Sequence, residues 1–486
     1  MAASRKSKVF SLSLAQGILT VSGVMSSMVF TRVLSKDDYA TYLQTFLAYD
    51  FLQPVLTLGL PLALYNLLPG ERHGKKVVLE VMLLLFAVGT LFSVFMFFGG
   101  TDLLAKRFNN PELSSTLRWL IPFPLYTFPL LCLSSILVVN DKVNVNSKYS
   151  VYTGLGRTLL LIIVTLIGGT YLYPIATRLI YPALIFPIGV YLSFKYTEGA
   201  FERPDLSSMW RILKFSIPLG LATTLASLSL QLSNMIVSSF CSPSDYAVYS
   251  TGAKEIPFIS IITGAIAVVI MADMSNLIKK GNVEASLQLF RKGATTSAMF
   301  LMPIMVFLFI YGDLFIKILY SDAYSDSVIP FRIYLFYLPI RIVQYNSVYI
   351  AFGQSKAVLF RTALELFFTI LYCVIFVWLF GYWGAALGAI LALYLWGVPY
   401  NIVKLSRSFG CKKREVLPFD KVGQVFLLSF VCGLIAAPCL WLNMPQIPKF
   451  VTGGVIYLLS YYLLMNRYFK DFKELVYPVI NKIRRK

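Results

Sequence analysis

Eight ionisable residues lie within stretches of this sequence that are otherwise apolar and about as long as a membrane-spanning helix. Five are basic and three are acidic, and they are Arg157, Arg178, Lys254, Arg332, Arg341, Asp50, Glu255 and Glu365. A charged side chain at the centre of a bilayer costs about 3 kcal/mol even on lenient scales. Charges persist there when they are paired, hydrated or functional, so these eight residues are the first candidates for a site.

The basic members of this set suit an anionic ligand. Arginine forks match phosphate oxygens in bidentate geometry, and tyrosine and amide side chains suit sugars. Arg341 shares a helical face with Tyr345, and Arg157 continues a face with Tyr149. We therefore expect a polyanion with polar groups to be bound by Arg157, Lys254, Arg341, Arg178, Gln16, Asn234 and Tyr345.

The acids Asp50, Glu255 and Glu365 could titrate or bind a cation, which would couple transport to a Na⁺ or H⁺ gradient. Simpler interpretations remain open for several of these residues. Arg178 and Arg332 lie near the predicted outer interface and could snorkel, and Arg361 and Glu365 are spaced to pair along one helix. Lys254 and Glu255 are adjacent, so on a helix they would point about 100° apart.

No residue pattern indicates an enzyme or a metal centre. We find no nucleophile constellation, paired-carboxylate site or glycine-rich phosphate loop, and the six cysteines have no disulfide or zinc spacing. The single histidine, His73, lies in a short basic loop and is interpreted as solvated surface. We expect no catalytic residue, no metal and no cofactor.

The elements that carry these residues are predicted to be membrane-spanning helices. The chain of 486 residues is 57% hydrophobic and 14% charged, whereas soluble domains are about 25% charged. A spanning helix needs about 20 apolar residues. We predict about fourteen spans, near 9–31, 41–67, 77–98, 116–139, 149–170, 174–194, 212–238, 247–272, 295–318, 329–352, 358–380, 383–403, 422–441 and 449–466. The first span is too long to be a signal-peptide core.

The distribution of lysine and arginine predicts the orientation of the chain. With both termini in the cytoplasm, 31 of the 43 basic residues fall in inside segments and seven in outside segments. This asymmetry follows the positive-inside rule. The net charge of +20 then faces anionic membrane lipids rather than nucleic acid.

The sequence contains an internal repeat. Residues 12–42 match residues 219–249 without a gap at eleven of 31 positions, most densely around the pattern Ser-x-x-Asp-Tyr-Ala-x-Tyr. The two copies are six spans apart, so the halves share one orientation. Polar residues gather on one face of both copies, including Gln16 and Asn234, and that face points to a cavity or to a neighbouring helix.

The repeat predicts an all-α integral membrane protein with two parallel six-helix lobes around a central cavity. The lobes are expected at 1–200 and 201–407. Residues 408–486 would add two helices and a basic cytoplasmic tail.

The chain resembles the polysaccharide-transport flippases of the MOP superfamily, the Wzx-type group related to lipid II flippases and multidrug antiporters. The resemblance covers nearly the whole chain. It rests on Thr31–Tyr42, on the echo Ser242–Tyr249, and on the segments Gly353–Lys356 and Gly381–Ala386.

This resemblance implies that an undecaprenyl-pyrophosphate-linked oligosaccharide is flipped across the cytoplasmic (inner) membrane by alternating access, for surface polysaccharide such as O-antigen or capsule. Polysaccharide polymerase machinery is a further candidate partner. Related flippases place cations in spans 1, 2 and 8. Lys254 matches the last placement, but span 1 offers only Arg32 and span 2 has Asp50 instead.

Two other functions are weighed against a flippase. An ion-coupled multidrug or metabolite antiporter of the same superfamily would favour an acidic cavity, whereas five of the eight buried charges here are basic. A membrane glycan polymerase or ligase would carry a large external loop, and the longest predicted outside loop is short.

Overall fold

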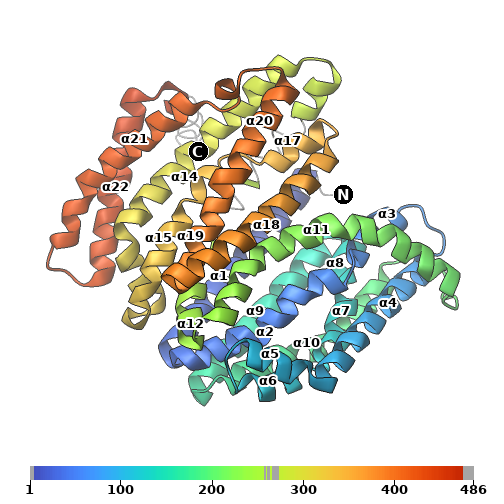
Figure 1. Cartoon of the computed structure of the whole chain (residues 1–486). Helices are drawn as coiled ribbons and strands as arrows, with labels where there is room; N and C mark the ends of the chain where they lie inside the picture. Colours follow the sequence, from blue (N-terminus) through green and yellow to red (C-terminus); the bar gives the residue numbers. More distant parts are fainter. Residues whose placement is uncertain (1–4, 257–258, 260–262, 265–272, 474–486) are drawn as a thin grey trace, which may run out of the picture. The chain divides into compact units, whose positions relative to one another are not determined.

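The computed structural model describes residues 5–256, 259, 263–264 and 273–473. Within these ranges the chain is helical and contains no strand (Figure 1). The chain divides into two compact units. Unit 1 comprises Met1–Ser250 with Thr369–Ala385, and unit 2 comprises Thr251–Phe368 with Ala386–Lys486. The expected lobe boundaries at residues 200 and 407 remain a prediction.

Unit 1 is built mainly from the first half of the chain. Its helices are α1 (Arg5–Val33), α2 (Lys36–Leu56), α3 (Leu60–Leu67), α4 (Gly74–Phe95), α5 (Thr101–Arg107), α6 (Leu113–Trp119), α7 (Phe123–Leu130), α8 (Cys132–Val139), α9 (Val143–Gly168), α10 (Leu172–Lys195), α11 (Leu206–Phe240) and most of α12 (Pro243–Gly252). Helix α1 packs along α9, α4 packs against α7, and α11 crosses both α2 and α3.

Unit 2 is centred on one long helix. Its helices are α14 (Val283–Tyr320), α15 (Val328–Leu335), α16 (Leu338–Arg341), α17 (Tyr345–Ala351), α20 (Val398–Phe409), α21 (Phe419–Ala436) and α22 (Gln446–Tyr468), and α18 (Ser355–Phe380) and α19 (Tyr382–Ala392) contribute to both units. Helices α21 and α22 form an antiparallel pair that packs against α14 (Figure 1).

The repeated sequence pattern has the same local structure in both copies. Ser35 accepts a hydrogen bond from the backbone N–H of Asp38 at the start of α2, at 3.1 Å. Ser242 accepts one from the N–H of Asp245 at the start of α12, also at 3.1 Å. Serine at this position satisfies a free N–H of the first turn. The Tyr-Ala-x-Tyr residues that follow are buried in both copies.

Among the residues that the structure describes, ten helical segments are long and apolar enough to cross a membrane, or eleven if one bent pair forms a single span. The predicted count of fourteen is therefore not confirmed. The predicted spans 212–238, 247–272 and 329–352 are not among these helices. Residues 253–256 are non-helical, and most of 257–272 lies outside the described residues. Pro257 disfavours helical backbone at the residue before it, which fits the end of α12 at Gly252.

The fourth and tenth predicted spans, which correspond in the repeat, are both broken. In the fourth, Leu113–Trp119 and Phe123–Val139 meet at 55°. In the tenth, α15, α16 and α17 are separated by non-helical residues at 336–337 and 342–344. Discontinuous helices at matching places of two halves are typical of transporter binding regions, because they expose backbone polar groups.

Two glycines allow α11 to cross the break between α2 and α3. Gly59 has a φ of +71°, and a Cβ on Gly59 would lie 2.5 Å from the Cα of Gly220. Nearby, the Thr224 hydroxyl donates a hydrogen bond to the carbonyl oxygen of Pro54 at 2.8 Å. The backbones approach so closely that neither position can carry a side chain without a shift.

Replacing Gly220 by alanine should therefore destabilise the protein by about 2 kcal/mol. The new Cβ would lie 2.5 Å from the Gly59 nitrogen and the Leu58 carbonyl carbon, which are backbone atoms. Thermal unfolding of the purified protein in detergent measures this effect. Gly23→Ala is the matched control, because nothing lies within 4 Å of its Cβ, and equal melting temperatures for the two variants would contradict the prediction.

Candidate functional site

Unit 1 brings Arg178 of α10 to Asp50 of α2. The Arg178 Nη2 atom lies 3.4 Å from Asp50 Oδ2. The guanidinium carbon lies 3.9 Å from the centre of the Phe46 ring and 5.9 Å from that of Tyr42. The carboxylate and the aromatic faces stabilise the partly buried cation. Arg178 therefore belongs to an ion pair inside the unit and does not only snorkel.

Arg157 of α9 joins this pair without an acidic partner of its own. It interacts electrostatically with Asp50, Arg178, Tyr42 and Tyr181. Within the described part of unit 1, no carboxylate lies within 4 Å of its guanidinium, and its side chain is exposed. Asp50, Arg157 and Arg178 form the unit 1 charge cluster, which has an excess of one positive charge.

Tyrosine side chains border the unit 1 charge cluster. Tyr126 donates a hydrogen bond to the Leu179 carbonyl at 2.6 Å, and Tyr49 shares one of 2.7 Å with Thr127. These bonds hold α7 against α10 and α2. The Tyr181 hydroxyl lies 2.6 Å from where a Cβ of Gly156 would be, so Gly156 makes room for it beside Arg157.

Unit 2 holds a second group of charges, which is balanced. Arg341 lies at the end of α16. Its Nη2 atom is 2.8 Å from Glu255 Oε2, and its guanidinium carbon is 4.7 Å from the centre of the Tyr337 ring. Arg361 and Glu365 pair at 3.1 Å on α18, as one of the simpler interpretations of the sequence predicted. Glu255, Arg341, Arg361 and Glu365 form the unit 2 charge cluster, with two cations and two anions.

The unit 2 charge cluster keeps unused hydrogen-bonding capacity. The Nε atoms of Arg341 and Arg361 and the Oε1 atom of Glu255 are buried and have no hydrogen-bond partner among the described residues. A buried polar atom without a partner costs about 1–3 kcal/mol. Arg341 also lies beside the non-helical residues 342–344. The cluster is therefore suited to binding additional polar groups.

The other predicted site residues lie in more ordinary surroundings. Asn234 donates to Gln231 Oε1 on its own helix at 3.3 Å, Gln16 is exposed on α1, and Tyr345 is buried. Arg332 donates to the Phe309 carbonyl at 3.0 Å. Asn234, Gln16 and Arg332 do not join either charge cluster. Tyr345 interacts electrostatically with Arg361 of the unit 2 charge cluster, and Arg361 donates a hydrogen bond to the neighbouring Asn346 at 3.1 Å.

Lys254 and Glu255 were predicted to lie on a membrane-spanning helix, but the structure places them in non-helical backbone. Both lie in the non-helical segment 253–256, so the angle of about 100° between helical neighbours does not apply. Lys254 is exposed and has no acidic partner within 4 Å in the described ranges. The end of α12 at Gly252 leaves Glu255 free to turn toward Arg341.

Sequence reasoning missed Glu80, a fully buried acid near the start of α4. Its carboxylate accepts hydrogen bonds from the Asp205 backbone N–H at 3.0 Å and from the Ser208 hydroxyl at 2.7 Å. Asp205 is the N-cap of α11, so Glu80 binds the positive end of that helix. An acid within an apolar run was the available signal, but it lies close to the predicted end of its span.

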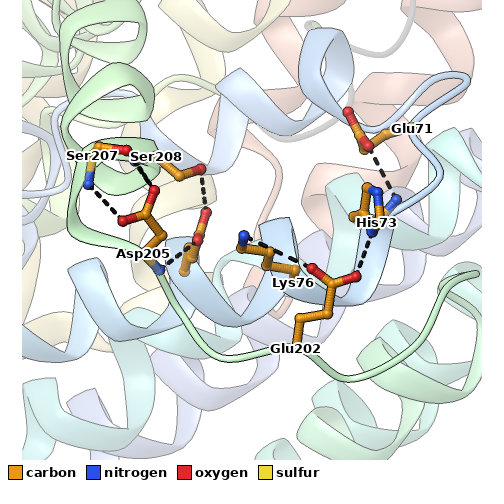
Figure 2. A network of polar contacts seen from close by, with 8 residues as sticks. Glu71, His73, Lys76, Glu202, Asp205, Ser207 and Ser208 are labelled. Carbon is orange, nitrogen blue, oxygen red and sulfur yellow. Dashed lines mark hydrogen bonds and ion pairs between the residues drawn. The ribbon is translucent and has the colours of Figure 1, made fainter.

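The Glu80 contacts are part of a polar network that ties the segment before α11 to the start of α4. Figure 2 shows the network around the labelled residues Asp205, Ser208 and Glu202. His73 Nδ1 lies 2.5 Å from Glu202 Oε1, and Lys76 lies 3.8 Å from the other oxygen. His73 is thus exposed, as expected, but it is also paired. Hydrogen bonds from the Ser207 hydroxyl and from the Ser207 and Ser208 N–H groups lower the pKa of Asp205.

Replacing Glu80 by alanine should destabilise the protein by about 2 kcal/mol, because the Asp205 N–H and the Ser208 hydroxyl would lose their acceptor in a buried place. Glu80→Gln retains one acceptor oxygen and should lose less. Thermal unfolding at neutral pH measures both variants. Glu198→Ala is a matched control, because Glu198 is exposed and its side chain is not part of the network in Figure 2. A Glu80→Ala protein as stable as this control would contradict the role of the network.

Comparison with known proteins connects this architecture to a transporter superfamily. The structure is similar to the lipid II flippase MurJ in an inward closed conformation, with a TM-score of 0.74, 17% identity, and coverage of 94% of this chain and 99% of that one. It also resembles an inward-facing multidrug MATE transporter, with a TM-score of 0.63 at 13% identity, over 83% and 98% of the two chains.

A third similar structure is a MOP superfamily transporter from Pyrococcus furiosus, for which the reversed polarity of the binding pocket suggests a different function. Its TM-score is 0.60 at 13% identity, over 85% of this chain and 98% of that one. No curated protein matches the chain. At these identities the structures establish the fold alone, which this chain shares with the lipid II flippase MurJ and with the two transporters.

The family profile described as "Polysaccharide biosynthesis protein" matches residues 29–329. This range covers more than half of the chain and includes the unit 1 charge cluster and Glu255. The chain is therefore a multi-pass membrane protein that belongs to the polysaccharide biosynthesis protein family and has the fold of the lipid II flippase MurJ.

Proposed function

We propose that this protein flips an undecaprenyl-pyrophosphate-linked oligosaccharide from the cytoplasmic to the outer face of the inner membrane. The observation that carries the proposal is the unit 1 charge cluster, in which Arg157 has no acidic partner among the described residues. A diphosphate supplies the missing negative charge, and the surrounding tyrosines suit the sugars. The family and the MOP fold support a lipid-linked substrate.

The carboxylates are proposed to act as exchangeable counter-ions. Asp50 and Glu255 each form an ion pair with an arginine, and that arginine could bind phosphate oxygens instead. Substrate phosphate and carboxylate would then compete for the same guanidinium groups. Binding of a proton or Na⁺ by Asp50 would release Arg178, which gives an ion gradient a route to drive the cycle.

An antiporter for cationic drugs is less well supported. Asp50, Glu255 and Glu365 each lie within 4 Å of an arginine. None of the three is therefore an unpaired anion that could bind a cationic drug directly.

Deletion of the gene in the native host tests the proposal. We expect complete lipid-linked repeat units to accumulate on the cytoplasmic side and surface polysaccharide to be lost, with recovery when the wild-type chain is restored. Analysis of extracted lipid-linked intermediates and of surface glycan measures both effects. Unchanged intermediates together with increased sensitivity to cationic drugs would favour the antiporter.

A further inference from the structure

Two cavities adjoin each other in unit 2, along α14, α21 and α22. The first, of about 690 Å³, has a polar lining that includes Arg291, Lys292 and Lys421. The second, of about 500 Å³, is almost entirely apolar. Its lining includes Phe300, Pro303, Ile304, Phe307, Gly454 and Leu458. Met299 lines both cavities, so the charged cavity and the apolar one are neighbours that share part of their wall.

The polar cavity has an excess of positive charge. Its lining holds three cations, Arg291, Lys292 and Lys421, and two acids, Asp420 and Asp471. Lys421 forms an ion pair with Asp471, with 2.5 Å between Nζ and Oδ2. In the described part of the chain, neither Arg291 nor Lys292 has a carboxylate within 4 Å. These two side chains are therefore free to bind an anion.

The apolar cavity lies on the surface of unit 2, between α14 and α22. Phe300 and Leu458 are exposed in the protein, and α14 and α22 are both long enough to span a bilayer. The apolar lining of this slot suits a hydrocarbon chain rather than a polar group. A soluble phosphate compound would use the polar cavity alone and would leave the apolar one open.

We propose that α14, α21 and α22 bind one anionic phospholipid. Its headgroup phosphate lies near Arg291 and Lys292, and an acyl chain lies along Phe300, Phe307 and Leu458. The segments 273–294 and 404–421 are among the most basic of the chain and are predicted to face the cytoplasm, where anionic lipids are concentrated. This site is independent of the charge clusters and of the proposed transport.

The test is lipid binding by the full-length protein, measured by native mass spectrometry from detergent. Dioleoylphosphatidylglycerol is the probe, and dioleoylphosphatidylcholine is the uncharged comparison. We expect the wild-type chain to retain phosphatidylglycerol at least tenfold more strongly. The double variant Arg291→Gln, Lys292→Gln should lose this preference, whereas Lys413→Gln, Arg414→Gln removes the same charge from an exposed loop outside the cavities and should keep it.

A second variant tests the apolar half of the site. A Cβ on Gly454 would meet only Phe307, at 3.5 Å, which is an ordinary contact, so Gly454→Leu should fold and extend into the slot. It should weaken binding of both lipids.

Three outcomes would overturn the proposal. They are equal retention of both lipids by the wild type, loss of preference in both double variants alike, and stronger retention of undecaprenyl phosphate than of phosphatidylglycerol. The last outcome would make the slot a site for the substrate's own lipid. None of these measurements depends on whether the protein transports an oligosaccharide.

Discussion

Replacing Arg157 by glutamine should reduce the rate of polysaccharide export by roughly 30-fold, since a hydrogen bond to a charged group contributes about 2 kcal/mol. Arg157 provides the excess positive charge of the unit 1 charge cluster. Its side chain is exposed and has no acidic partner among the described residues, so its removal leaves no new unpaired charge. Protein level and melting temperature should therefore remain close to those of the wild type.

Pulse-labelling of surface polysaccharide in a complemented deletion strain measures this rate at matched protein levels. Arg157→Lys should retain part of the activity, because it preserves the charge but not the fork geometry. Arg332→Gln is the matched control, because that arginine binds the Phe309 carbonyl outside both clusters. Normal export by Arg157→Gln would remove Arg157 from the substrate site.

The second large effect is expected at the ion pair between Arg341 and Glu255. Arg341→Met should lower the free energy of unfolding by about 3 kcal/mol, because it leaves a partly buried carboxylate without its partner. The double variant Arg341→Met, Glu255→Met should recover most of this stability, since both charges are then absent. If Arg341 also binds substrate, the double variant should still export at least tenfold more slowly than the wild type.

Thermal unfolding and export, measured on the same three variants, separate the two roles of Arg341. Stability that recovers together with export would show that the pair is only structural. Stability that recovers without export would show that Arg341 contacts the substrate or takes part in the conformational cycle.

The membrane character, the transporter fold and most of the charged residues of interest could be predicted from the sequence. The cost of placing a charge in a bilayer singles out Arg178, Asp50, Arg341 and Glu255, whatever their partners are. The repeated Ser-x-x-Asp pattern was found in the sequence, but its role as a helix cap was first seen in the structure, although capping is a local property that depends on residues three positions apart.

The partners of these charges could not be predicted. Asp50 and Arg178 are 128 positions apart, and Glu255 and Arg341 are 86 apart. Such pairs depend on how the helices pack, and hydropathy does not record packing. The breaks in the fourth and tenth predicted spans were missed for a similar reason, since a continuous helix and a broken one can be equally apolar. Glu80 was overlooked because its partners, Asp205 and Ser208, belong to a distant helix start.

The most direct test of the account is transfer of an undecaprenyl-pyrophosphate-linked oligosaccharide across proteoliposomes that contain only this protein. A glycosidase added outside the vesicles reports which substrate molecules have reached the outer leaflet. We predict transfer well above that of protein-free vesicles, with most of it lost in Arg157→Gln. Folded wild-type protein that moves the complete repeat unit of its native host no faster than empty vesicles would contradict the proposed function.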